Sequence, residues 1–170
     1  KAGAHPSRRL ETKISYRRTV LTEPPMKLAV QSGNIEIVKA MLAAKAKPGY
    51  WGSLPYNQPS ALAIAREMLA AGGSPEYALQ CLYYVQDPAP FVDLYVDAGA
   101  DVNAVSEGGW TLVHQAAAPV IRALAKHGVD LNRQNDEGWT PLELAVMSGQ
   151  DSISRQRAAR ALRELGATVK

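Results

Sequence analysis

The sequence marks both ends of a short helix between Asp136 and Gln150, DEGWTPLELAVMSGQ. Thr140 can cap the helix with its hydroxyl, Pro141 suits the first helical position because no backbone donor is needed there, and Gly149 can end the helix. The apolar residues of this helix fall on one face, at Leu142, Ala145 and Val146. A helix this short cannot bury that face alone, so the segment predicts similar units elsewhere in the chain.

The same segment carries a repeat signature. Thr140-Pro141-Leu142, followed by Ala145 and then Ser148-Gly149, resembles the ankyrin repeat pattern G-x-T-P-L-x-x-A-x-x-x-G. The resemblance implies an all-α solenoid of stacked helix-turn-helix units joined by hairpin loops. A chain of 170 residues has room for four to five such units of roughly 33 residues each. The 46% hydrophobic content, with a single Phe, also suits close-packed short helices.

We expect an ankyrin-repeat domain over residues 23–170, with about four irregular repeats at 23–49, 74–104, 107–133 and 136–168. The place of a further helix at 60–71 is ambiguous. If Ser60 takes the Thr position of the signature, the next anchor, Thr111, lies 51 residues later, whereas Tyr77 in that position gives a spacing of 34 residues. The shorter spacing fits the repeat period better and makes the helix at 60–71 an extra one.

The positive charge of the chain is concentrated at its start. Residues 1–20 carry a net charge of +5 and the remaining 150 carry −2, which together give the overall +3. We expect residues 1–22 to form a basic N-terminal arm or cap. Basic arms of this kind are usually solvated, and some contact nucleic acid or anionic surfaces. Binding of nucleic acid or an anionic surface through this arm is therefore the alternative function.

The sequence offers little support for catalysis, a cofactor or a metal site. The histidines His5, His114 and His127 are far apart, and the single cysteine, Cys81, lies among apolar residues at helical spacing, which predicts a buried, inert thiol. No phosphate-binding or nucleophile motif occurs, so we expect a non-catalytic protein without cofactors. His114 stands in the T-P-L-H position, where the resemblance implies that it braces neighbouring turns by hydrogen bonds.

All three tryptophans, Trp51, Trp110 and Trp139, fall in loops between the expected repeats. The resemblance places the last two at the hairpin tips, facing a partner, and Trp51 would continue the row with Tyr50 and Tyr56. Exposed aromatic side chains at loop tips are typical of protein-binding surfaces. The polar residues that would surround them form a somewhat acidic rim and are Glu107, Gln134, Asp136 and Glu137.

We therefore expect a monomeric protein-protein interaction module that binds another protein through these residues and its concave helix faces. Bacterial ankyrin-repeat proteins include exported proteins that restrain an enzyme made in the same cell, which suggests an inhibitor or immunity-type role. Because the sequence starts at Lys1 and not at Met, we expect an exported or periplasmic location ahead of a cytoplasmic one. No apolar run approaches the ~20 residues needed to span a bilayer.

Overall fold

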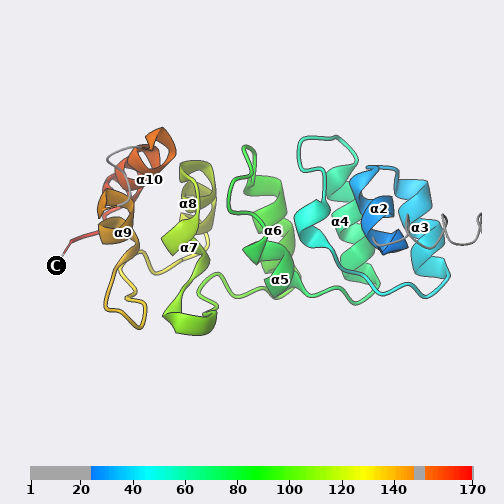
Figure 1. Ribbon diagram of the computed structural model, residues 1–170, viewed down its shortest axis with the longest axis horizontal. Coiled ribbons are helices and arrows are strands. Elements are labelled where there is room, and N and C mark those ends of the chain that lie inside the picture. Colours follow the sequence, from blue (N-terminus) through cyan, green and yellow to red (C-terminus); the bar gives the residue numbers. More distant parts are fainter. Residues whose placement is uncertain (1–23, 148–151, 170) are drawn as a thin grey trace, which may run out of the picture.

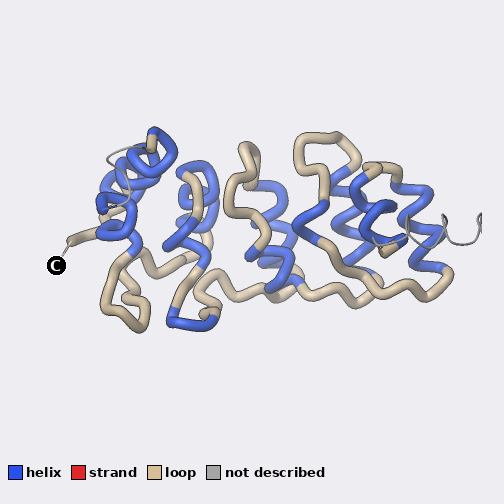
Figure 2. Tube along the Cα trace, viewed as in Figure 1, coloured by secondary structure: helices blue, strands red, loops and turns tan. Residues whose placement is uncertain are grey.

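The computed structural model describes residues 24–147 and 152–169 (Figure 1). In this part of the chain the regular structure is helical, apart from one isolated bridge between Val105 and Thr111 (Figure 2). The prediction of an all-α fold is confirmed. The α-helices are α2 (Pro25–Gln31), α3 (Ile35–Ala43), α4 (Ala61–Ala70), α5 (Pro75–Gln80), α6 (Ala89–Asp97), α7 (Leu112–Gln115), α8 (Ala118–Ala125), α9 (Pro141–Met147) and α10 (Ile153–Glu164), and the 3-10 turns are η1 (Trp51–Ser53) and η2 (Glu107–Gly109).

The helices stack along one long axis in two rows (Figure 1). We call α2, η1, α5, α7 and α9 the first row, in which η1 contacts both α2 and α5, and α7 contacts α9. We call α3, α4, α6, α8 and α10 the second row, in which each helix contacts the next. Each element of the first row is followed along the chain by one of the second row. This alternation is the helix-turn-helix arrangement that the sequence predicts for a repeat solenoid.

The extra helix expected at 60–71 is α4, and the structure gives it a regular place in the stack. It lies between α3 and α6 in the second row, while η1 lies between α2 and α5 in the first. The hydroxyl of Ser60 donates a hydrogen bond to the carbonyl of Gly33 in the preceding repeat, at 2.7 Å. We infer that residues 50–73 form an additional repeat unit whose first helix has been reduced to the turn η1.

The start of α9 follows the local prediction. The Oγ1 of Thr140 accepts the N–H of Glu143 at 3.3 Å, and the Glu143 carboxylate accepts the N–H of Thr140 at 2.8 Å. These reciprocal bonds satisfy two backbone donors that would otherwise be unpaired at the helix start. Pro141 is the first residue of the helix, as predicted. Gly149, which was predicted to end this helix, lies outside the described residues.

The last helix separates polar from apolar residues. α10 packs against α8 and α9 with buried side chains that are mostly small: Ala158, Ala159, Ala161 and Leu162. Alanines at these positions allow the helix axes to approach closely. Four arginines lie at other positions of α10, and three of them, Arg157, Arg160 and Arg163, are exposed. The outer face of the last described helix is therefore rich in positive charge.

Candidate binding surface on the hairpin loops

The loops that precede α7 and α9 fold alike. In residues 105–111 the N–H of Ser106 donates to the carbonyl of Trp110 at 2.7 Å, and in residues 134–140 the N–H of Asn135 donates to the carbonyl of Trp139 at 3.0 Å. Both loops are therefore closed hairpins. Trp110 and Trp139 hold equivalent positions in them.

The two hairpins also contact each other. The N–H of Asp136 donates to the carbonyl of Gly108 at 3.0 Å, which joins the second hairpin to the first. The approach is close at Gly109, where an added Cβ would lie 2.7 Å from the backbone nitrogen of Asp136. Gly109 also has a φ of +73°, a conformation that side chains with a Cβ rarely adopt. The absence of a side chain at Gly109 thus allows the two hairpins to pack as one surface.

Asn135 organises the second hairpin, a role that the sequence analysis missed. Its side chain is buried, and its Oδ1 accepts the N–H groups of Glu137 at 3.1 Å and Trp139 at 2.9 Å. An Asn side chain that accepts bonds from the backbone two to four residues later favours a tight turn. The N-D-E-G sequence from Asn135 to Gly138 was the available signal for this turn.

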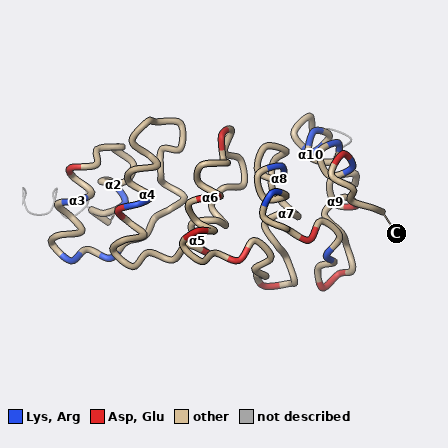
Figure 3. The backbone as a smooth tube through the Cα atoms, turned by 180° about the vertical axis from the view of Figure 1, so that it is seen from behind, with Lys and Arg blue, Asp and Glu red and all other residues tan. Residues whose placement is uncertain are grey.

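We define the hairpin ridge as Glu107, Trp110, Gln134, Asp136, Glu137 and Trp139. Trp139 is 36% exposed, whereas Trp110 is partly buried and its ring lies edge-on to His114, with centroids 5.6 Å apart. The other four side chains are exposed. Acidic residues recur on the hairpin loops beside α7 and α9 (Figure 3). Arg133, which precedes the second hairpin in the chain, is exposed. The ridge therefore combines one exposed indole with three carboxylates and one amide.

The buried side chain of His114 links the two hairpins. Its Nδ1 accepts the N–H of Thr111 at 3.1 Å and lies 2.8 Å from the Thr111 hydroxyl, which places the ring proton on Nε2. Nε2 then donates to the carbonyl of Trp139 at 3.3 Å. The bracing role predicted for His114 is confirmed, because a single buried ring is bonded to residues of both hairpins.

The predicted exposed aromatic row does not extend to Trp51, and that prediction is wrong. The Trp51 ring is 1% exposed and lies edge-on to Tyr95, with centroids 5.6 Å apart. Tyr56 is partly buried against Phe91 and donates its hydroxyl to the carbonyl of Trp51 at 3.2 Å. Both rings belong to the hydrophobic core around the turn η1. Tyr50 is 40% exposed, but it lies in a different loop from the hairpin ridge.

Residues 79–169 match a family described as ankyrin repeats in three copies, and this match covers more than half of the chain. The chain belongs to the ankyrin repeat family. No curated protein matches it. Ankyrin repeats are generally protein-protein interaction modules and are typically non-catalytic.

In this ankyrin-repeat protein His114 should make stability depend on pH. Burial lowers the pKa of His114 and outweighs the hydrogen bond to the Trp139 carbonyl, which raises it. Below about pH 6.5 the unfolded chain therefore binds a proton more readily than the folded chain does. The neutral, buried form of His114 is therefore fully compatible with the folded state above about pH 6.5. Below that pH we expect the free energy of unfolding to fall, because protonation of His114 favours the unfolded chain. Urea unfolding at pH 5 to 8 measures this dependence.

The variant His114→Gln tests the assignment of that pH dependence. Its free energy of unfolding should be lower than that of the wild type by roughly 1–3 kcal/mol at neutral pH, because the Thr111 N–H and the Trp139 carbonyl lose their partner. The stability difference from the wild type should shrink between pH 7.5 and pH 5, since the titrating ring is absent. His127→Gln, at the partly exposed histidine that contacts Asp93, serves as the control. A difference that does not change with pH would contradict the assignment.

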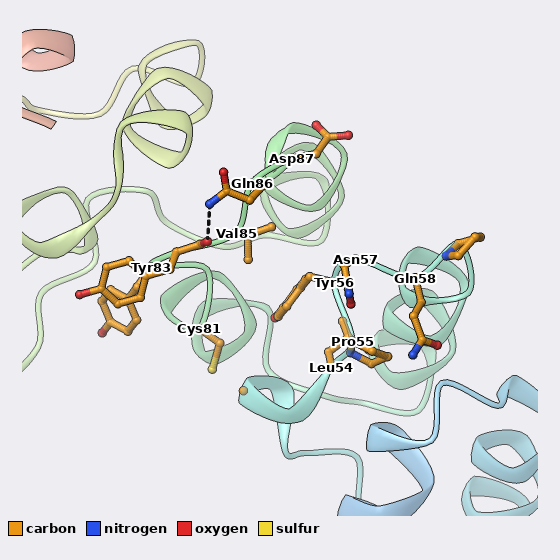
Figure 4. A pocket seen from close by; sticks show the side chains of 13 residues that line it. Leu54, Pro55, Tyr56, Asn57, Gln58, Cys81, Tyr83, Val85, Gln86 and Asp87 are labelled. Atoms are coloured by element: carbon orange, nitrogen blue, oxygen red, sulfur yellow. Dashed lines mark hydrogen bonds between the residues drawn. The ribbon is translucent and has the colours of Figure 1, made fainter. Parts of the chain in front are cut away.

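A second feature of the ankyrin stack is a cleft of about 720 Å³ between residues 54–59 and residues 81–87 (Figure 4). Tyr56 and Val85 approach it from the two sides, and Cys81 lies lower on the wall formed by residues 81–87 (Figure 4). Cys81 is partly exposed and not fully buried as predicted. Burial raises the pKa of its thiol, which keeps the sulfur protonated and weakly nucleophilic at neutral pH. The prediction of an inert thiol is consistent with this shift.

Among residues 24–147 and 152–169, no group of three or more His, Cys, Asp or Glu side chains could hold a metal ion. In the same residues no helix is long and apolar enough to cross a membrane.

Proposed function

We propose that this ankyrin-repeat protein binds a partner protein through the hairpin ridge and catalyses no reaction itself. The exposed indole of Trp139 carries the proposal, because Trp is the side chain most enriched at the energetic centres of protein interfaces. The hydrogen bonds from Asp136 to Gly108 and from His114 to Trp139 support it further. A surface that is already ordered loses less entropy on binding than a mobile loop does.

The charge of the ridge indicates the chemistry of the partner. Glu107, Asp136 and Glu137 are the exposed carboxylates of the ridge, and Arg133, just before it in the chain, is an exposed cation. A partner with an apolar patch bordered by Lys or Arg would complement this arrangement. The inhibitor or immunity-type role, directed at a co-expressed enzyme, stays a prediction. Identification of the partner would test it.

Trp139→Ala should weaken partner binding by about 2 kcal/mol, or roughly 30-fold, because a large exposed anchor is lost. The thermal midpoint should change little, since the ring is only partly covered in the isolated chain. The partner is first captured with wild-type protein. Its affinity for both proteins is then measured by calorimetry after purification, and circular dichroism gives the melting curves.

The matched control for this experiment is Tyr84→Ala. Tyr84 is 67% exposed, and it lies in the connection between α5 and α6, outside the hairpin ridge. This variant should bind the partner as the wild type does. Equal losses in the two variants, or full affinity in Trp139→Ala, would contradict the proposal. Full affinity in Trp139→Ala is also the result that the alternative predicts, because binding through residues 1–22 would not use the ridge.

A further inference from the structure

A second cleft, of about 610 Å³, lies between α8 and α10. It is lined mainly by these two second-row helices, together with Gln86 and Ala117 from connecting segments, and contains none of the residues of the hairpin ridge. Arginines are frequent on α10, and α8 adds Arg122, whereas Asp and Glu recur on the hairpin loops (Figure 3). The charged and hydroxyl side chains that line the cleft are Arg122 from α8 and Ser154, Arg157, Arg160 and Glu164 from α10.

The cleft already holds one carboxylate that belongs to the chain itself. Arg122 donates from Nη2 to one oxygen of Glu164 at 2.5 Å, and Arg160 donates from Nε to the other oxygen at 2.9 Å. These bonds lower the pKa of Glu164, with the bond from Arg122 the larger cause. The guanidinium groups of the cleft are therefore placed so that two of them can bind a single carboxylate.

Positive charge remains after this pairing. Three arginines face one carboxylate among the lining residues, and Arg157 is exposed and forms no ion pair within residues 24–147 and 152–169. The N-terminus of α8 borders the cleft at Ala118 and Pro119, and no side chain caps it. The start of a helix carries a partial positive charge, which has the same sign as the arginines. The unpaired charge thus favours an anionic ligand.

We infer that this cleft binds the carboxylates of an acidic segment, rich in Glu or Asp, of a partner protein. The volume supports a segment over a single small anion, because clefts of several hundred Å³ accommodate ligands much larger than one phosphate. The two arginines on Glu164 support a carboxylate as the group that is bound. This site lies outside the hairpin ridge and prefers a ligand of the opposite charge, so it goes beyond the proposed function.

Fluorescence anisotropy with labelled hexaglutamate and the full chain tests the inference. The wild type should bind the peptide at low salt, and the affinity should fall as salt is added. Arg157→Gln should weaken binding roughly 10-fold, because a hydrogen bond between charged groups is lost. The fold should be kept in this variant, since Arg157 has no ion pair among the described residues. Absence of peptide binding by the wild type would overturn the inference.

Arg163→Gln is the matched control on the same helix. Arg163 is exposed like Arg157 but does not line the cleft, so this variant should keep the wild-type affinity. An equal loss in both variants would overturn the inference, because it would indicate attraction by surface charge in general. Trp139→Ala should also bind the peptide normally, which separates this site from the proposed function of the ridge.

Two further measurements exclude other sources of binding. A full-length variant with Arg8, Arg9, Arg17 and Arg18 changed to Gln should retain the peptide affinity and the 10-fold effect of Arg157→Gln. Loss of both would place the binding in the basic N-terminal residues and overturn the inference. Inorganic phosphate alone should bind more weakly than hexaglutamate, and tighter binding of phosphate would overturn the choice of an acidic segment.

Discussion

Trp51→Ala is expected to lower the free energy of unfolding by about 3–5 kcal/mol, the cost typical of truncating a large buried aromatic side chain. The ring is 1% exposed, and Gly73 makes room for it, because a Cβ at Gly73 would lie 2.7 Å from the ring carbon Cζ2. It occupies the first row between α2 and α5, where a helix is missing, so its removal should leave a cavity. Urea unfolding followed by circular dichroism measures the effect.

The position of Trp51 also predicts where the protein should loosen. In a solenoid each repeat contacts only its neighbours, and α2 and α3 join the rest of the stack through η1 and α4. In Trp51→Ala, hydrogen exchange should therefore accelerate more in α2 and α3 than in α8 and α10. Trp51→Phe, which keeps an apolar ring, should be less destabilised. Unchanged stability together with lost partner binding in Trp51→Ala would contradict its assignment to the core.

Gly109→Ala is expected to destabilise the protein by roughly 2–5 kcal/mol. A positive φ costs a residue with a Cβ roughly 1–2 kcal/mol, and overpacking typically adds about 1–3 kcal/mol. The new Cβ would lie 2.7 Å from the backbone nitrogen of Asp136, an atom that cannot move without breaking its bond to Gly108. We expect the two hairpins to separate and partner affinity to fall. Chemical unfolding and calorimetry with the partner measure the two effects.

Gly128→Ala is the control for the backbone part of this effect. Gly128 has a φ of +75°, close to that of Gly109, but no atom lies within 4 Å of a Cβ built at this position. The free energy of unfolding of Gly128→Ala should fall by only roughly 1–2 kcal/mol, which is the cost of backbone strain at a positive φ. The difference between the two variants then measures the contact between the hairpins. Equal destabilisation in both would contradict the close approach at Asp136.

Local sequence was sufficient where one helix and its cap decide the structure. Thr140 and Pro141 predicted the start of α9. The hydrogen-bonding role of His114 followed from its place in the repeat signature. The start of α9 depends on residues within about one helical turn of each other, whose relative positions a helix fixes. The bond from His114 to Trp139 spans 25 residues, and only the family resemblance predicted it.

The sequence was a poor guide to the depth of an aromatic ring in a loop. Trp51 and Trp139 both follow a turn rich in small or polar residues, but one ring is buried and the other is 36% exposed. The difference arises because the unit around Trp51 lacks a first-row helix and the unit around Trp139 has one, α9. Spacing between signature residues could not show this, since it counted α4 as an extra helix.

The sequence by itself determined that this chain forms an ankyrin stack of short helices and where α9 begins. Tertiary structure decided which rings are buried, that Gly109 lets two hairpins pack together, and that Arg122 joins Arg157 and Arg160 around one cleft. Helix periodicity and capping act between near neighbours in the chain. Burial and charge clustering depend on residues separated by tens of positions, whose distances are fixed only when the repeats stack.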